Sequence, residues 1–131
     1  GLAPPPGSRS RADYYRWLFF AAGPLEAAVA DKVLGAAVPA EKQGMIGYGN
    51  FDLVVATLDQ ALAGKTALVD GRFSAADVYV GSHLMWGKQF GTLPKRPSFE
   101  SYCAGLAGRP ASTRASAIDD ALVPNHPMPS R

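Results

Sequence analysis

The sequence GRFSAADV, residues 71–78, contains the best-defined start of a helix in this chain. Ser74 lies three residues before Asp77, so its hydroxyl oxygen can accept the backbone N–H of Asp77 while the carboxylate reaches back to the N–H of Ser74. Phe73 before this capping box and Val78 after it are placed to form a hydrophobic staple. The pattern predicts a helix that begins at Ser74, and it gives Phe73, Ser74 and Asp77 a structural role at its start.

The residues that follow, VYVGSHLMWGKQF (78–90), place apolar side chains on all sides of this predicted helix. Such a helix usually lies buried at the centre of its domain. Apolar residues at i, i+3, i+4 and i+7 predict further helices before and after it. Together, the expected helices span residues 10–32, 39–63, 74–90, 97–107 and 110–122.

Prolines and glycines mark the expected interruptions. Pro24 lies within the first predicted helix and should kink its axis, because proline donates no backbone hydrogen bond. Gly44, Gly47 and Gly49 weaken the first half of the second predicted helix, each by about 1 kcal/mol relative to alanine. The stretch 65–72 is expected to be a connecting loop.

Composition and charge argue against several classes of function. The chain has 131 residues, of which 47% are apolar and 18% charged, and its formal net charge is +2. Its basic residues are scattered, which argues against a nucleic-acid partner. No apolar run approaches the roughly 18 residues that span a membrane. The single cysteine cannot form an internal disulfide, so we expect a reduced, cytoplasmic compartment.

Reactive side chains do not form a catalytic or metal-binding pattern in the sequence. Cys103 shares the apolar stripe of its helix and is expected to be a buried, inert thiol. His83 is expected to be a hydrogen-bonded core residue, and His126 lies in the C-terminal tail, so the three residues lack the spacing of a zinc site. The tripeptide GKT at 64–66 looks like the end of a phosphate-binding loop, but Asp59 stands where that loop requires glycine. We predict no catalytic residue and no metal ligand in this chain.

Several segments together resemble one protein family. The segment 71–78 is similar to the start of the central helix in the C-terminal domain of glutathione S-transferases. The segment RPSF at 96–99, followed by Tyr102, and the segment GRPA at 108–111 are similar to the next two helix starts of that family. Upstream, YRWLFF at 15–20 resembles the first long helix of the same domain.

This resemblance, which extends over about residues 12–122, implies an all-α domain, the five-helix bundle of a glutathione S-transferase C-terminal domain. Residues 1–11 are then an interdomain linker or arm, residues 12–123 the helical domain, and residues 124–131 an irregular tail. The proline-rich start is the composition expected of a chain cut at a domain junction.

In this family an N-terminal thioredoxin-like domain binds glutathione and supplies the residue that activates its thiol. The resemblance therefore implies a parent protein that is a glutathione transferase with glutathione as co-substrate. It implies that this chain binds no cofactor and is inactive by itself. The implied partners are the thioredoxin-like domain, a second copy in a homodimer, and a small hydrophobic electrophile.

By resemblance, the second face of the first helix and the end of the central helix line the pocket for that electrophile. The candidate lining residues are Tyr15, Phe19, Gly23, Glu26, Trp86 and Phe90. Phe19 and Ala27 stand where bacterial relatives have polar residues that reach glutathione, and neither side chain can hydrogen-bond to a peptide. This departure favours contact with an apolar second substrate over contact with glutathione.

An alternative is a non-catalytic protein–protein interaction or scaffold module of the same fold. Phe19 and Phe20 fall outside the core stripe of their helix. Two large rings there indicate that this face meets another surface. In the alternative, that surface belongs to a protein partner rather than to the other half of an enzyme.

Overall fold

The computed structural model describes residues 1–122, and the predicted tail at 124–131, with His126, lies outside the described residues. The described part is all-α, as predicted, and its one extended pairing is an isolated bridge between Val69 and Arg72. A π-helical segment, η1 (Ala21–Leu25), and a 3-10 segment, η2 (Ala40–Met45), accompany the α-helices. These are α1 (Ser10–Phe20), α2 (Glu26–Leu34), α3 (Phe51–Leu62), α4 (Ala75–Phe90), α5 (Pro97–Ala107) and α6 (Pro110–Leu122).

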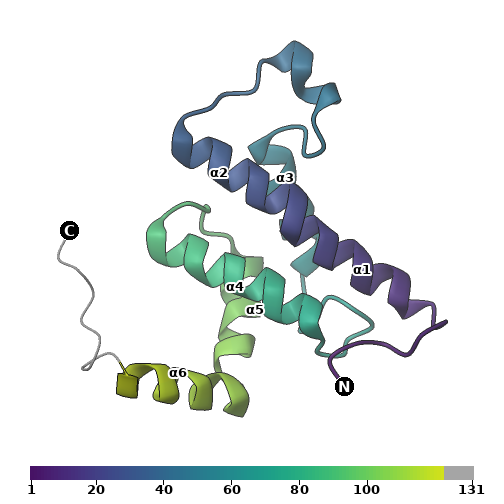
Figure 1. Cartoon of the computed structure of the whole chain (residues 1–131), viewed down its shortest axis with the longest axis vertical. Helices are drawn as coiled ribbons and strands as arrows, with labels where there is room; N and C mark the ends of the chain where they lie inside the picture. Colours follow the sequence, from purple (N-terminus) through teal and green to yellow (C-terminus); the bar gives the residue numbers. More distant parts are fainter. Residues whose placement is uncertain (123–131) are drawn as a thin grey trace.

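The helix predicted over residues 10–32 is one long rod made of α1, η1 and α2 (Figure 1). Pro24 lies inside η1, where the N–H of Glu26 donates to the carbonyl of Ala21, five residues earlier. A proline offers no N–H and its ring clashes with the carbonyl four residues before it, and the wider π-turn accommodates both defects. With this rod counted as one helix, the described chain contains the five predicted helices.

The prediction of one helix over residues 39–63 is wrong in its first half. Residues there form only the short η2 segment and a loop, and α3 begins at Phe51. Gly49 has a positive φ of 71°, and the Oδ1 of Asn50 accepts the N–H of Leu53 at 2.8 Å. The left-handed glycine ends the preceding turn, and the asparagine side chain caps α3 anew.

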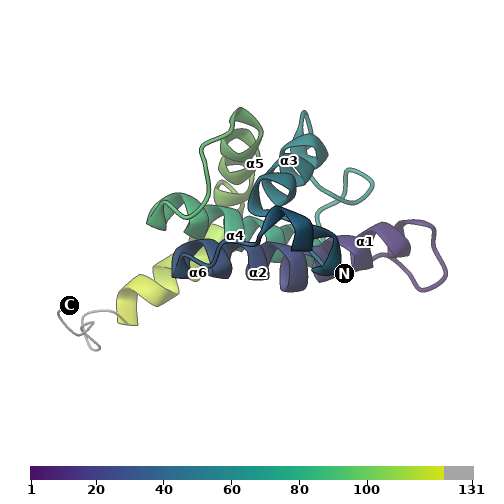
Figure 2. The same cartoon turned by 90° about the horizontal axis from the view of Figure 1, so that it is seen from above.

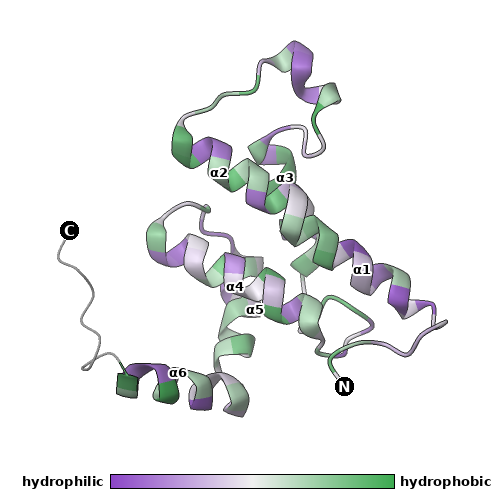
Figure 3. Cartoon of the chain, viewed as in Figure 1, coloured by the Kyte–Doolittle hydropathy of each residue, from purple (hydrophilic) through white to green (hydrophobic). Residues whose placement is uncertain are grey.

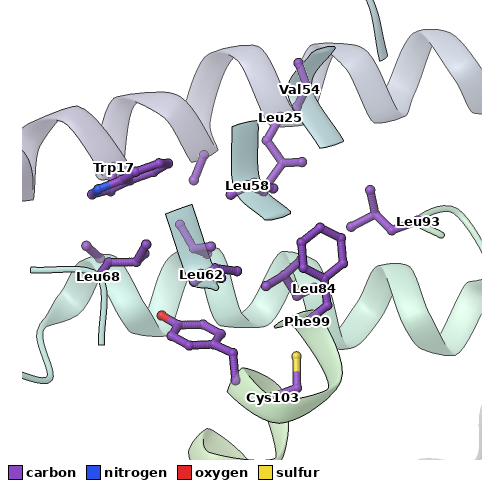
Figure 4. Close-up of a cluster of buried hydrophobic side chains, with 14 of the residues drawn as sticks. Trp17, Leu25, Val54, Leu58, Leu62, Leu68, Leu84, Leu93, Phe99 and Cys103 are labelled. Atoms are coloured by element: carbon purple, nitrogen blue, oxygen red, sulfur yellow. The ribbon is translucent and has the colours of Figure 1, made fainter. Parts of the chain in front are cut away.

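The helices form two layers with the core between them. Figure 2 shows α1, α2 and α4 in one layer and α3 beside α5 in the other. α6 follows α5 and buries no residue, and hydrophobic and hydrophilic residues alternate along it in Figure 3. The core side chains that meet between the layers (Figure 4) include Trp17, Leu25, Val54, Leu58, Leu62, Leu84 and Phe99.

The prediction that the central helix is buried on all sides is wrong. α4 buries one face, which contains Val80, Gly81, Leu84 and Gly87. Val78 and two rings near the end of the helix are exposed, and 67% of Trp86 is accessible to solvent. The α3–α5 layer covers only one side of α4, so the opposite side remains open among the described residues.

Asp77 connects three parts of the chain although it is fully buried. Its carboxylate accepts the N–H of Ser74 at 2.8 Å and the hydroxyl of the same residue at 3.0 Å, within the capping box at the start of α4. It also accepts the N–H of Leu68 at 2.8 Å and the hydroxyl of Tyr102 at 2.7 Å. The capping residue therefore also holds the 65–72 loop and α5 in place.

The residues next to this capping box differ from the predicted staple. Phe73 packs against the core, and the guanidinium carbon of Arg109 lies 3.4 Å from the centre of its ring. Val78, the predicted staple partner, is exposed. Phe73 therefore joins the start of α4 to the α5–α6 junction, because the cation lies over its aromatic face.

Residues 1–11, predicted as a linker or arm, fold back against the start of α4. The N–H of Ala75 donates to the carbonyl of Leu2 at 2.7 Å, and the guanidinium of Arg11 donates to the carbonyl of Pro4. Ala75 is in the first turn of α4, where backbone N–H groups have no partner within the helix. The segment therefore supplies an acceptor to the helix end.

Gly87 on α4 is required for close packing in the core. Gly105 on α5 has open space around it and serves as its matched control. A Cβ at Gly87 would lie 2.9 Å from the Cβ of Leu93, whereas a Cβ at Gly105 meets nothing within 4 Å. We expect Gly87→Ala to lower the free energy of unfolding by about 1–3 kcal/mol through overpacking. We expect Gly105→Ala to raise it by about 1 kcal/mol. Urea unfolding of the two variants measures both changes, and equal effects would contradict the packing shown here.

Tyr102 should make stability depend on alkaline pH. Burial and the hydrogen bond to Asp77 raise the pKa of Tyr102 well above its ordinary value. The pKa of the phenol is about 10 in the unfolded chain and higher in the folded protein. Tyr102 therefore stabilises the folded state fully below about pH 10, and this contribution is lost as the pH rises further. Tyr102→Phe should cost about 1–3 kcal/mol near neutral pH, because the buried carboxylate loses a donor.

The same variant provides the pH test. Above about pH 10, the free energy of unfolding should fall more steeply for the unmodified protein than for Tyr102→Phe. Urea unfolding at several alkaline pH values measures the two slopes. Identical slopes would show that the Tyr102 phenol does not contribute this dependence.

Candidate functional site

An open groove of about 710 Å³ lies between α2 and α4. Glu26 and Val29 form its α2 side, and Thr92 follows the end of α4. The α4 side consists of Tyr79, Ser82, His83, Trp86, Gly87 and Phe90. Apart from Gly87, which is buried, these α4 residues lie on the part of the helix that the α3–α5 layer leaves partly or fully accessible.

The spacing of the rings along α4 explains why they line one groove. Tyr79, His83, Trp86 and Phe90 follow i, i+4, i+7 and i+11 spacing, which places them on one stripe of a helix. The ring centroids of Tyr79 and His83 are 5.1 Å apart, and those of Trp86 and Phe90 are 6.0 Å apart with an edge-to-face angle of 71°. The result is an aromatic wall that the solvent can reach.

Glu26 and His83 contribute the carboxylate and the imidazole of the groove. The Nδ1 of His83 lies 3.7 Å from the Oε2 of Glu26, which is too long for a direct hydrogen bond. The Glu26 side chain is 63% exposed, and most of the His83 side chain is covered. The hydroxyl of Ser82 donates to the carbonyl of Tyr79 at 2.8 Å, so its proton is engaged within the helix.

The groove contains three of the six residues that the sequence suggested for a pocket, namely Glu26, Trp86 and Phe90. Gly23 lies in the π-helical segment and is exposed. Tyr15 and Phe19 lie one turn apart on α1, outside the residues that line the groove, with ring centroids 6.3 Å apart.

Tyr15 and Phe19 form a separate aromatic pair on the surface. Arg11 donates to the hydroxyl of Tyr15 through Nε at 3.0 Å and Nη2 at 2.8 Å, and 71% of Phe19 is exposed. Phe20, which the sequence placed on the same outer face, instead packs against the core edge-to-face with Trp17. Only one of the two neighbouring phenylalanines is therefore an exposed ring.

Sequence reasoning missed most of the α4 side of the groove. The expectation that His83 is a hydrogen-bonded core residue is wrong, because it faces Glu26 across the groove. Tyr79 and Val29 were not recognised either. The stripe of rings from Tyr79 to Phe90 is visible in the sequence, but the resemblance assigns only its last two rings, Trp86 and Phe90, to a pocket.

The described residues contain no activated nucleophile in or near the groove. Cys103 is buried in the core cluster, and burial raises the pKa of its thiol. Within residues 1–122, no group of three or more His, Cys, Asp or Glu side chains could hold a metal ion. The rings and the carboxylate that line the groove are of the kind that bind and orient a small molecule.

Comparison with solved structures shows which fold this is. A glutathione S-transferase from a sphingomonad, in complex with glutathione, matches with a TM-score of 0.69 at 27% identity over 92% of this chain. The chain has the fold of a glutathione S-transferase C-terminal domain. It spans 59% of the length of that sphingomonad protein.

Two further bacterial structures with this glutathione S-transferase fold agree. One, from Actinobacillus pleuropneumoniae, matches with a TM-score of 0.69 at 23% identity and covers 91% of this chain and 55% of its own. The other, the bacterial enzyme BphK in a ternary complex, matches with a TM-score of 0.70 at 21% identity and covers 91% and 59%. Compared by sequence, the chain matches no family model and no curated protein. Among residues 1–122, no helix is long and apolar enough to cross a membrane.

The two tryptophans should report the groove and the core separately. Trp86 is 67% exposed in the groove, whereas Trp17 is 6% exposed in the core. We expect acrylamide to quench the fluorescence of Trp17→Phe, which retains Trp86, several-fold more strongly than that of Trp86→Phe. Equal quenching constants in the two variants would contradict this placement of the rings.

Proposed function

We propose that the chain supplies the electrophile-site wall of a glutathione-conjugating protein. The observation that carries this proposal is the aromatic groove between α2 and α4, on a domain whose fold matches that of bacterial glutathione S-transferases. Pockets for small apolar molecules are typically concave and lined by aromatic side chains with a few polar groups. The groove meets this description with Trp86, Phe90 and Tyr79 beside Glu26 and His83.

The chemistry of the reaction supports dividing it between two parts of a protein. Conjugation needs a thiol with a lowered pKa and an electrophile held close to it. We assign the first task to the thioredoxin-like domain, and the one cysteine of this chain, Cys103, is itself buried with a raised pKa. The groove suits the second task, because apolar walls bind and orient an electrophile.

The lining of the groove favours the electrophile over glutathione as its occupant. Glutathione carries two carboxylates, and recognition of a carboxylate typically uses Arg, Lys or backbone N–H groups. None of the described residues that line the groove is a lysine or an arginine. We therefore assign glutathione binding to a thioredoxin-like domain outside this chain.

The proposal includes the partners of the domain. The exposed pair Tyr15 and Phe19 on α1 supports contact with the thioredoxin-like domain, since large exposed rings mark interaction surfaces. Part of the domain would also contact a second copy in a homodimer. A non-catalytic docking module of the same fold is the second candidate, and the same exposed pair favours it.

A conjugation assay distinguishes the two candidates. We would measure conjugation of glutathione to chlorodinitrobenzene by a protein in which this chain follows a thioredoxin-like glutathione-binding domain. The enzyme proposal expects faster turnover than for the thioredoxin-like domain alone, because the groove orients the electrophile. Equal turnover would support the docking module instead.

Variants then locate the electrophile. Trp86→Ala should raise the KM for chlorodinitrobenzene about fivefold, through loss of aromatic contact, and should leave the KM for glutathione nearly unchanged. Ile118→Ala is the matched control, because Ile118 is exposed on α6 and does not line the groove. A parallel rise in both KM values, or a rise in the control, would contradict the assignment of the groove to the electrophile.

A further inference from the structure

The groove between α2 and α4 has an uneven distribution of charge. Glu26 contributes a carboxylate that is 63% exposed at its edge. Among the described residues, the lining contains no lysine or arginine to neutralise this charge. Lys88, one residue beyond Gly87 on α4, pairs with Glu100 of α5 instead. The lining of the groove therefore contains a carboxylate and no permanently cationic side chain.

The aromatic wall reinforces this preference for positive charge. The faces of tryptophan, tyrosine and phenylalanine rings are electron-rich and attract cations within about 6 Å. Tyr79, Trp86 and Phe90 lie on the same stripe of α4 and line the same groove as Glu26. Rings and a carboxylate that face one space form a typical binding arrangement for ammonium groups.

We propose that this groove selects small molecules that join a flat aromatic body to a positively charged ammonium group, and that it disfavours their anionic counterparts. This inference rests on the proposed function and names the substrate class of that site. The flat body would lie along Trp86 and Phe90, and the ammonium group would lie beside Glu26. His83, whose Nδ1 is 3.7 Å from the Glu26 carboxylate, would border the same position.

Desolvation and charge predict different affinities for three otherwise similar compounds. An anion would lie near the Glu26 carboxylate without a cation to pair with, and a neutral compound would gain only the aromatic contact. A cation gains the aromatic contact, the attraction of the Glu26 carboxylate and the attraction of the electron-rich ring faces. Because Glu26 is largely exposed, solvent weakens the carboxylate contribution, and we expect a preference of about fivefold for the cation over the neutral compound.

The test uses three dinitrophenyl compounds that share one aromatic body. Dinitrophenyl-ethylenediamine is cationic, dinitrophenyl-ethanolamine is neutral and dinitrophenyl-glycine is anionic. Equilibrium dialysis against the 131-residue chain, at about pH 8 and low salt, gives a Kd for each. We expect the cation to bind most tightly and the anion most weakly, and we expect the difference to shrink at about 0.5 M salt because of screening.

Glu26→Gln tests the source of the preference, and Glu41→Gln is its matched control. Glu41 is an exposed carboxylate on the 3-10 segment and does not line the groove. Glu26→Gln should remove most of the advantage of the cation over the neutral compound, leaving only the attraction of the ring faces, whereas Glu41→Gln should leave all three Kd values unchanged. Circular dichroism of both variants verifies that the helices are retained.

The outcomes separate this inference from the proposed function. Equal Kd values for the three compounds, or a cation preference that Glu26→Gln leaves undiminished, would overturn the charge selection by Glu26 while leaving the groove as an aromatic site. If a folded chain binds none of the three compounds, the assignment of the groove to an electrophile also fails. A shift caused equally by Glu41→Gln would show a general effect of net charge and would overturn the role of Glu26.

Discussion

The buried carboxylate of Asp77 is the interaction on which the rest of the structure depends. A buried carboxylate is costly unless donors surround it. Here the donors come from the N-cap residue of α4, from the loop before it and from α5. The cost of burial is therefore offset only when these three segments are in their native positions. A side chain that caps one helix thus also fixes the geometry of the layers around it.

The open side of the molecule follows from how the layers pack. α3 and α5 cover one side of α4, and the continuous rod of α1, η1 and α2 lies beside it (Figure 2). The π-turn at Pro24 lets that rod continue past the proline, so Glu26 and Val29 extend alongside the C-terminal half of α4. The described layers bury one face of α4, and exposed residues of the helix form one wall of the groove.

In the proposed function, the described part of the chain contributes by holding and orienting a small molecule. The rings of the groove are positioned by one helix and the carboxylate by another, and both helices are anchored in the core. Preorganised walls of this kind restrict how a small molecule lies, which is the part of catalysis that depends on orientation. In the proposed charge selection, the Glu26 carboxylate on the opposite side would discriminate among molecules of the same shape.

The sequence by itself determined the helices and their boundaries wherever a local signal exists. The capping box at Ser74 and the prolines at the starts of α5 and α6 are read from a few neighbouring residues, and the structure has helices starting at each of these places. The resemblance built on these segments also led to the correct fold. Local signals were insufficient in the glycine-rich stretch before Asn50. The sequence predicts one helix over residues 39–63, but Asn50 caps a new helix that begins at Phe51.

Only the tertiary structure decided which apolar faces are covered. An exposed ring and a buried ring have the same periodicity, so Trp86 and Leu84 were equally compatible with a core helix. Phe19 and Phe20 are adjacent in sequence, yet one packs against Trp17 and the other is exposed. The partners of Asp77 and the approach of His83 to Glu26 likewise depend on helices far apart in sequence. Burial is a property of the packed layers, and for this reason the groove could not be located from the pattern of residues alone.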